Sequence, residues 1–201
     1  VPEVGIGKEI NTIIAAEQNP YLMRSSFPNR AEDLTALYKL SGNQLLWLGN
    51  ANASKNIHDA LGLLASAASH GLNPANYDVD VLQQKLPAVL SLNSDAYLQL
   101  ALYDTALSIS ILRFAHDLHY GTVDPKSLNF NLKPRQKKLL DLPTLIKNSV
   151  ASGTIAQLPQ QVVPKLKQYA KLKQALATYT DLAKTTPPIK LFIKKDWKVH
   201  N

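Results

Sequence analysis

The sequence contains no cysteine among its 201 residues. This absence excludes disulfides, zinc sites built on thiolates and every mechanism that uses a cysteine nucleophile. Glycine is also scarce, at 8 residues, whereas leucine and alanine fill most segments. A β-sandwich needs many more turns and β-branched strands than this composition supplies, so the sequence favours helices.

Long apolar runs and late glutamates are missing as well. No stretch of 18 apolar residues occurs, so no segment is predicted to span a membrane. All four glutamates lie in the first 32 residues, at Glu3, Glu9, Glu17 and Glu32. Acid–base chemistry in the middle of the chain would therefore depend on aspartate alone.

The net charge of +7 is unevenly distributed along the chain. Residues 1–125 hold 7 Lys/Arg against 12 Asp/Glu, whereas residues 126–201 hold 15 Lys/Arg against 3 Asp. A basic half indicates an acidic partner, such as an anionic lipid surface, a cell-wall polymer, nucleic acid or an acidic protein face. A solvated lysine-rich surface without a dedicated partner is the alternative. The candidate basic surface consists of Lys165, Lys167, Lys171 and Lys173.

Apolar spacing predicts helices along most of the chain. The predicted helices cover residues 8–18, 54–70, 95–120, 143–152 and 160–184. A further helix is predicted to begin at a capping box formed by Asn29 and Glu32. The range 95–120 is apolar nearly all round, which is typical of a helix around which others pack. We therefore predict an all-α fold: a single compact multi-helix domain packed around one long apolar central helix. Residues 1–184 form this domain, and 185–201 are a basic tail or the start of a missing downstream domain.

Few side chains are candidates for chemistry. Asp104 lies in the apolar central helix, where it is either an acid with a raised pKa or a buried carboxylate bonded to nearby backbone and hydroxyl groups. Arg113 and Asp117 are four residues apart and are predicted to pair on one helical face. His116 and His119 have the spacing to share a metal with Asp117, yet few other ligands remain, so no metal or other cofactor is predicted.

Common catalytic and nucleotide-binding motifs are absent, including G-x-S-x-G, the P-loop, G-x-G-x-x-G and H-E-x-x-H. Nucleic-acid binding is not favoured either, because no aromatic platform interleaves with the lysines of residues 160–184.

Several strings, read together, resemble one known family. The first are Leu37-Tyr38, Leu45-Leu46-Trp47 and Ala67-Ala68-Ser69-His70-Gly71-Leu72-Asn73-Pro74-Ala75-Asn76-Tyr77. The next are Tyr103-Asp104-Thr105-Ala106-Leu107, and Leu112-Arg113-Phe114-Ala115-His116-Asp117-Leu118-His119-Tyr120-Gly121-Thr122-Val123-Asp124-Pro125. The last is the spacing of Tyr169, Leu172, Leu176 and Tyr179. In this order they resemble the non-catalytic helical scaffold region of large periplasmic L,D-transpeptidases, over about residues 27–183.

The resemblance implies an all-α scaffold domain of the bacterial envelope, periplasmic or secreted. In the relatives it is attached to a peptidoglycan-binding module and to a catalytic domain that joins peptidoglycan stem peptides with a cysteine in a Ser-His-Gly-Cys setting. This chain has no such string, so no catalytic residue is carried over. The motif residues are expected to make the fold: Gly71 and Gly121 cap helices, Pro74 and Pro125 fix turns, and Trp47 fills the core. The remaining motif positions are His70, Leu72, Tyr77, Asp104, Arg113, His116, Asp117 and Asp124.

Three functional hypotheses follow. The first is a non-catalytic scaffold in peptidoglycan remodelling, whose partner is a downstream catalytic domain or a cell-wall enzyme and which contacts peptidoglycan itself. The second is a stand-alone secreted helical protein that binds an anionic envelope surface or protein through its basic half. The third is a peptidoglycan-cleaving enzyme using Asp104 or Asp117. Relatives continue past the tyrosine helix, whereas this chain reaches Asn201, so an excised fragment and an independent protein are both left open.

Overall fold

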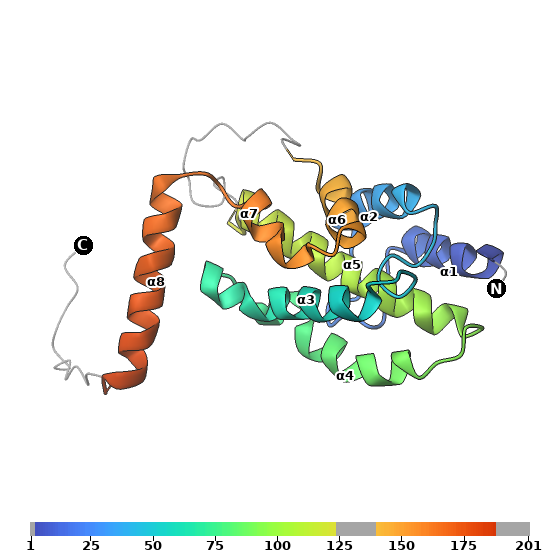
Figure 1. Cartoon of the computed structure of the whole chain (residues 1–201), viewed down its shortest axis with the longest axis horizontal. Coiled ribbons are helices and arrows are strands. Elements are labelled where there is room, and N and C mark those ends of the chain that lie inside the picture. Colours follow the sequence, from blue (N-terminus) through green and yellow to red (C-terminus); the bar gives the residue numbers. More distant parts are fainter. Residues whose placement is uncertain (1–2, 124–139, 188–201) are drawn as a thin grey trace, which may run out of the picture. The chain divides into compact units, whose positions relative to one another are not determined.

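The computed structural model describes residues 3–123 and 140–187 of the chain (Figure 1). Contacts divide the chain into two units, residues 1–165 and residues 166–201. Within the described residues all regular structure is helical, apart from one isolated bridge between Gln18 and Ser26. The predicted all-α fold class is therefore confirmed.

Eleven helical segments are described, some of them short 3-10 helices. The α-helices are α1 (Glu3–Ala16), α2 (Pro28–Leu40), α3 (Ala53–Ala65), α4 (Val79–Leu90), α5 (Tyr97–Tyr120), α6 (Leu142–Ala151), α7 (Leu158–Val162) and α8 (Lys167–Thr185). The 3-10 helices are η1 (Ser66–His70), η2 (Pro74–Tyr77) and η4 (Ile155–Gln157). No described helix is long and apolar enough to cross a membrane.

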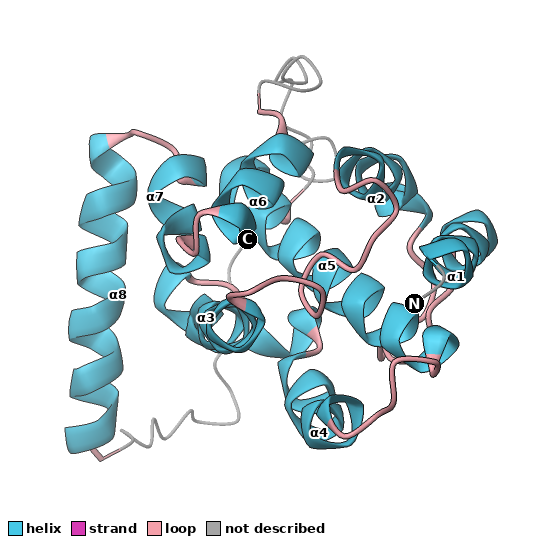
Figure 2. Cartoon of the chain, turned by 45° about the vertical axis from the view of Figure 1, so that its right-hand side comes forward, coloured by secondary structure: helices cyan, strands magenta, loops and turns pink. Residues whose placement is uncertain are grey.

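The first unit is built around α5. This helix contacts α1, α2, α3, α4, α6 and α7, and Figure 2 shows it running through the middle of the surrounding helices. Its 24 residues make it about 36 Å long. Most of its side chains from Ala101 to Leu118 are buried, as the apolar pattern predicted. The prediction of a long central helix is confirmed.

Two local predictions hold. Leu46 and Trp47 are buried in a segment between α2 and α3 that forms no helix, so Trp47 fills the core as expected. Gly71 follows η1 with φ 76° and ψ 14°, the left-handed conformation that glycine adopts without a Cβ penalty. The Leu72 N–H then donates to the Ala67 carbonyl, which closes the helix end.

The predicted start of α2 is wrong. Asn29 does not cap this helix, which begins at Pro28 with Phe27 in the N-cap position and no side-chain cap. Proline is favoured in the first turn because its missing N–H would have no partner there, and this preference decides the start. The predicted helix 54–70 is also divided, because α3 ends at Ala65 and a 3-10 turn completes the range.

The predicted helix 160–184 is wrong at its beginning. Val163 has an extended backbone, at φ −60° and ψ 143°, and lies between α7 and α8. Pro164 explains the break, because a residue before proline is pushed out of the helical region and proline offers no N–H. α8 has no buried residue, and Leu172 and Tyr179 are each 70% exposed. The proposed boundary at 184/185 stays a prediction, since residues 188–201 are outside the described part.

A matched pair of glycine substitutions tests the end of α5. Gly121 has φ 83° and ψ 166°, a region that only glycine populates readily, although a Cβ there would meet no neighbouring atom. Gly121→Ala is expected to lower the free energy of unfolding by about 1–3 kcal/mol through backbone strain alone. Gly62→Ala, in the interior of α3 and equally free of clashes, is expected to raise it by about 0.5–1 kcal/mol. Urea denaturation of both variants measures these changes. A shift of both unfolding free energies in the same direction would contradict this account.

Candidate functional site

Asp104 lies at the centre of a buried hydrogen-bonded cluster. Its carboxylate accepts hydrogen bonds from the Tyr38 hydroxyl at 2.6 Å and from the backbone N–H groups of Leu46 at 2.8 Å, Trp47 at 2.9 Å and Leu48 at 3.0 Å. Asp104 itself has no exposed surface. The structural interpretation of this residue is thus correct, and a carboxylate so enclosed does not reach a substrate.

The energetics of Asp104 combine opposite effects. Burial raises the pKa of its carboxyl, and the hydrogen bonds from Tyr38 and the three backbone groups counteract that rise. The pKa of the Tyr38 hydroxyl is raised by burial first and by the neighbouring Asp104 charge second. Ser108 extends the cluster, because its hydroxyl accepts from the Trp47 indole at 2.9 Å and lies 3.0 Å from the Tyr38 oxygen. The cluster fastens the irregular segment 45–48 to α5.

Arg113 forms a second cluster, with a partner other than the predicted one. Its guanidinium pairs with Asp78 at 3.1 Å and donates to the backbone carbonyls of Arg24 and Ser26, each at 3.1 Å. The Asp78 side chain is only 2% exposed and also accepts from the Met23 N–H at 2.7 Å. The predicted Arg113–Asp117 pair is therefore wrong: the buried carboxylate reached by Arg113 comes from the turn before α4.

Asp117 bonds with neighbours from two directions instead. It accepts from the Tyr77 hydroxyl at 3.0 Å, and its other oxygen lies 3.2 Å from Nδ1 of His116. Tyr77 is fully buried and packs edge-to-face on Phe114 at 5.5 Å between ring centroids. His70 meets the same Phe114 ring at 6.2 Å. The string around Gly71 and the string around Arg113 thus pack directly on each other.

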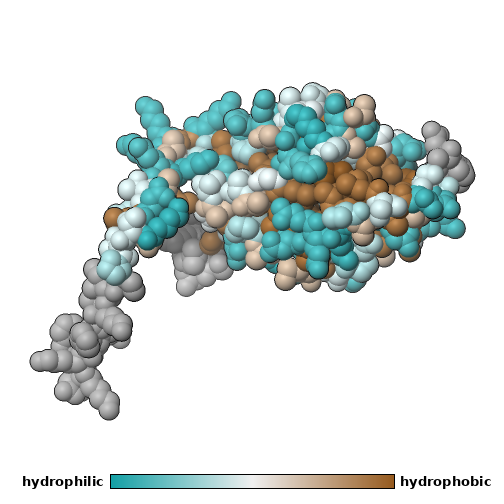
Figure 3. Space-filling view, turned by 60° about the horizontal axis from the view of Figure 1, so that its bottom comes forward, coloured by the Kyte–Doolittle hydropathy of each residue, from teal (hydrophilic) through white to brown (hydrophobic). Residues whose placement is uncertain are grey.

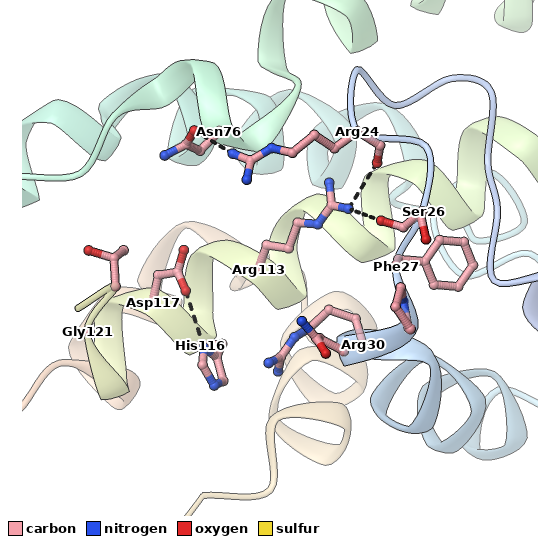
Figure 4. A pocket seen from close by; sticks show the side chains of 12 residues that line it. Arg24, Ser26, Phe27, Arg30, Asn76, Arg113, His116, Asp117 and Gly121 are labelled. Carbon is pink, nitrogen blue, oxygen red and sulfur yellow. Dashed lines mark hydrogen bonds and ion pairs between the residues drawn. The ribbon is translucent and has the colours of Figure 1, made fainter. Parts of the chain in front are cut away.

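One hollow opens beside this second cluster. It has a volume of about 690 Å³, and Figure 4 shows guanidinium groups together with the Asp117 carboxylate around it. Its lining residues are Arg24, Ser26, Phe27, Pro28, Asn29, Arg30, Asn76, Arg113, His116, Asp117, Gly121 and Thr122. The predicted residues Arg113, His116, Asp117 and Gly121 therefore meet at one pocket, which we call the arginine pocket.

Three arginines give the arginine pocket its character. Arg24 donates to the Asn76 side-chain oxygen at 2.6 Å, and Arg30 pairs with Asp33 at 2.9 Å. Burial lowers the pKa of Arg113, and the positive charges of Arg24 and Arg30 lower it further, whereas Asp78 opposes them. Arg24 and Arg30 therefore lie close enough to Arg113 for their positive charges to act on it.

The other predicted residues lie elsewhere. Trp47 and Asp104 belong to the first cluster, and Pro74 opens η2, where the Asn73 side chain accepts from the Ala75 N–H. Nδ1 of His119 bonds to the Val162 carbonyl at 2.7 Å. In the described part of the chain, no group of three His, Cys, Asp or Glu is arranged to hold a metal ion. Asp124 and Pro125 lie outside the described residues.

The candidate basic residues Lys165, Lys167, Lys171 and Lys173 are all exposed. Three of them belong to α8, on which Leu172 and Tyr179 are exposed as well. These four lysines therefore lie at the surface of the described chain.

Sequence reasoning missed Asp78, Arg24 and Arg30, and it quoted Asn76 only as part of the string around Gly71. Asp78 had a readable signal, because Val79, Leu82, Leu86 and Val89 follow it at helical spacing and mark the overlooked helix α4. An acidic residue directly before such a run is a typical helix start. Arg24 carried no comparable signal, since its side chain bonds to Asn76, 52 residues further along the chain. Arg30 pairs locally with Asp33, and that pair gives no indication of the pocket.

The geometry defines a class of protein: an all-helical domain whose polar motif residues form hydrogen bonds and ion pairs with other residues of the same domain. The sequence model of the Scaffold domain family matches residues 32–176. This match covers more than half of the chain, so the chain belongs to the Scaffold domain family. No curated protein and no solved structure matches the chain.

Proposed function

We propose that this chain is a non-catalytic scaffold and interaction domain of an L,D-transpeptidase-like protein that acts in peptidoglycan remodelling in the bacterial envelope, either periplasmic or secreted. It holds a downstream catalytic domain or a cell-wall enzyme in position and contacts peptidoglycan. The proposal joins the family membership to the resemblance of the strings around Gly71 and Arg113.

One observation carries this proposal: the motif residues interlock with each other. Tyr38, Trp47 and Asp104 form one buried cluster. Arg113 and Asp117 join the segment around Tyr77 and Asp78 in the other. Side chains that share their hydrogen bonds in this way specify a rigid fold, which suits a domain that positions other domains.

The surface also suits a domain that packs against others. Figure 3 shows a hydrophobic area, in brown, on one face of the molecule. Exposed apolar side chains of the first unit include Met23 at 70% and Leu90 at 57%. Contiguous exposed apolar surface is typical of interaction sites.

The test combines the native gene with the wall chemistry. The reading frame around the segment for residues 1–201 is expected to encode a peptidoglycan-binding module and a Ser-His-Gly-Cys string. Deleting the gene is expected to reduce the stem-peptide cross-links made by such enzymes, measured by muropeptide analysis, and the wild-type gene restores them. The purified chain is expected to release no muropeptides from sacculi. Unchanged cross-links after deletion, or release of muropeptides by the chain, would contradict the proposal.

The exposed lysines and apolar side chains of α8 favour a second candidate function, binding of an anionic envelope surface or protein by a stand-alone protein. This second function predicts that the reading frame encodes no Ser-His-Gly-Cys string and that deleting the gene leaves the cross-links unchanged. Purified chain would then bind anionic vesicles in a manner that weakens steeply with salt, because exposed charges are screened over about 8 Å at physiological ionic strength.

A further inference from the structure

We propose that the arginine pocket is a binding site for a carboxylate-bearing peptide. A ligand carboxylate lies against Arg24 and Arg30, and a peptide N–H of the same ligand donates to Asp117. This inference goes beyond positioning of a partner domain, and it stands on the pocket alone, independently of any relation to transpeptidases.

The arginines of the pocket retain donors for a ligand. A guanidinium has five N–H groups in a planar fork. Arg24 directs one nitrogen to the neutral Asn76 amide, and Arg30 directs one nitrogen to Asp33. Arg113, by contrast, is held by Asp78 and two backbone carbonyls. Arg24 and Arg30 are therefore the groups that face a ligand, and Arg113 supports the wall behind them.

The electrostatics of the pocket favour an anion. The three arginines lie close enough for Arg24 and Arg30 to disfavour the charged form of Arg113. An anionic group between them would relieve this repulsion and form charge-assisted hydrogen bonds, which are stronger than neutral ones. The first turn of α2 adds to the effect, because Phe27, Pro28 and Asn29 line the pocket and the helix start carries a partial positive charge.

The size and the opposite wall select a peptide over a simple ion. A volume of about 690 Å³ is in the range of sites for organic ligands and far larger than one phosphate ion needs. Asp117 lines the same space and would repel a multiply charged phosphate, whereas its carboxylate accepts a hydrogen bond from an amide N–H. Asn76 and Ser26 offer further polar partners, and Phe27 offers an apolar surface.

The test is calorimetric titration of the full chain with three probes. They are the peptide acetyl-Ala-Gln-Ala with its terminal carboxylate free, the same peptide with an amidated end and therefore no carboxylate, and inorganic phosphate. We expect binding of the acidic peptide, at least tenfold weaker binding of the neutral peptide, and weaker binding of phosphate than of the acidic peptide. This comparison uses the wild-type chain and does not depend on how any variant folds.

Variants then locate the site. Arg24→Gln and Arg30→Gln are each expected to weaken the acidic peptide at least tenfold, and Asp117→Asn to weaken the acidic and neutral peptides by a similar factor. Lys8→Gln, an exposed residue of α1, is the charge-matched control and is expected to change nothing. Circular dichroism confirms that each variant is folded. Equal binding of the two peptides, tighter binding of phosphate, no binding of the acidic peptide at millimolar concentration, or unchanged affinity in both folded arginine variants would overturn the proposal. None of these outcomes depends on the cross-links of the wall, so failure of the peptide site would not contradict the scaffold function.

Discussion

Asp104→Ala is expected to lower the free energy of unfolding by about 3–6 kcal/mol. The change removes the shared acceptor of three backbone N–H groups, those of Leu46 and Trp47 buried, and leaves the Tyr38 hydroxyl with Ser108 alone. Each buried donor left unpaired costs about 1–3 kcal/mol, and the losses are not fully additive because the groups are neighbours. Total domain stabilities are about 5–15 kcal/mol, so the loss is a large part of the whole.

Urea denaturation followed by tryptophan fluorescence measures this change, because Trp47 is itself bonded to Asp104 and fully buried. Asp104→Asn is expected to fall between the wild type and Asp104→Ala, since one oxygen acceptor remains while the new amide N–H₂ faces donors. The control is Asp95→Ala, at an exposed position before α5, with an expected effect within about 0.5 kcal/mol. An Asp104→Ala midpoint close to that of the control would mean that the cluster contributes little stability.

The central helix was predictable because its signal is local. The apolar run that follows Asp95 continues on every side of the helix, and only the element at the centre of a bundle can bury such a surface. Gly71 and Gly121 were equally readable as helix ends, because their conformations at positive φ are a property of the residue itself. Signals of this kind do not depend on distant parts of the chain.

The partner of Arg113 was not predictable by the same means. A spacing of four residues brings Asp117 onto the same helical face, but a surface pair of this kind is worth only a few tenths of a kcal/mol. Asp78 is buried, and a buried carboxylate without a cation is far more costly, so the fold brings Arg113 to it. The need to pair the buried Asp78 outweighs the small gain from a pair within one helix. The sequence does not reveal which turn will lie against α5.

The residues of the arginine pocket also divide into those that the sequence indicated and those that only the fold brings together. His116, Asp117 and Gly121 could be singled out because they follow one another within a single string. Arg24 and Arg30 come from the loop before α2 and from its first turn, and only the packing of that loop on α5 brings them to the same space. Sequence patterns therefore located one wall of the pocket, and the opposite wall required the fold.

Arg113→Met is expected to lower the free energy of unfolding by about 3–5 kcal/mol. The substitution keeps most of the side-chain volume but leaves the Asp78 carboxylate buried without its cation. It also removes the donor that holds the backbone carbonyls of Arg24 and Ser26. Lys39→Met, at an exposed position of α2, is the control and is expected to have little effect.

A second substitution identifies which carboxylate Arg113 needs. In a double-mutant cycle, Arg113→Met combined with Asp78→Asn is expected to cost at least 1 kcal/mol less than the sum of the two single changes, because either one alone breaks the pair. Arg113→Met combined with Asp117→Asn is expected to be nearly additive, since Asp117 bonds to Tyr77 and His116 instead. Chemical denaturation of the five variants supplies all the values. Strong coupling to Asp117 together with additivity at Asp78 would restore the helical pair and reject the buried one, because only the residue that shares an interaction with Arg113 can depend on its presence.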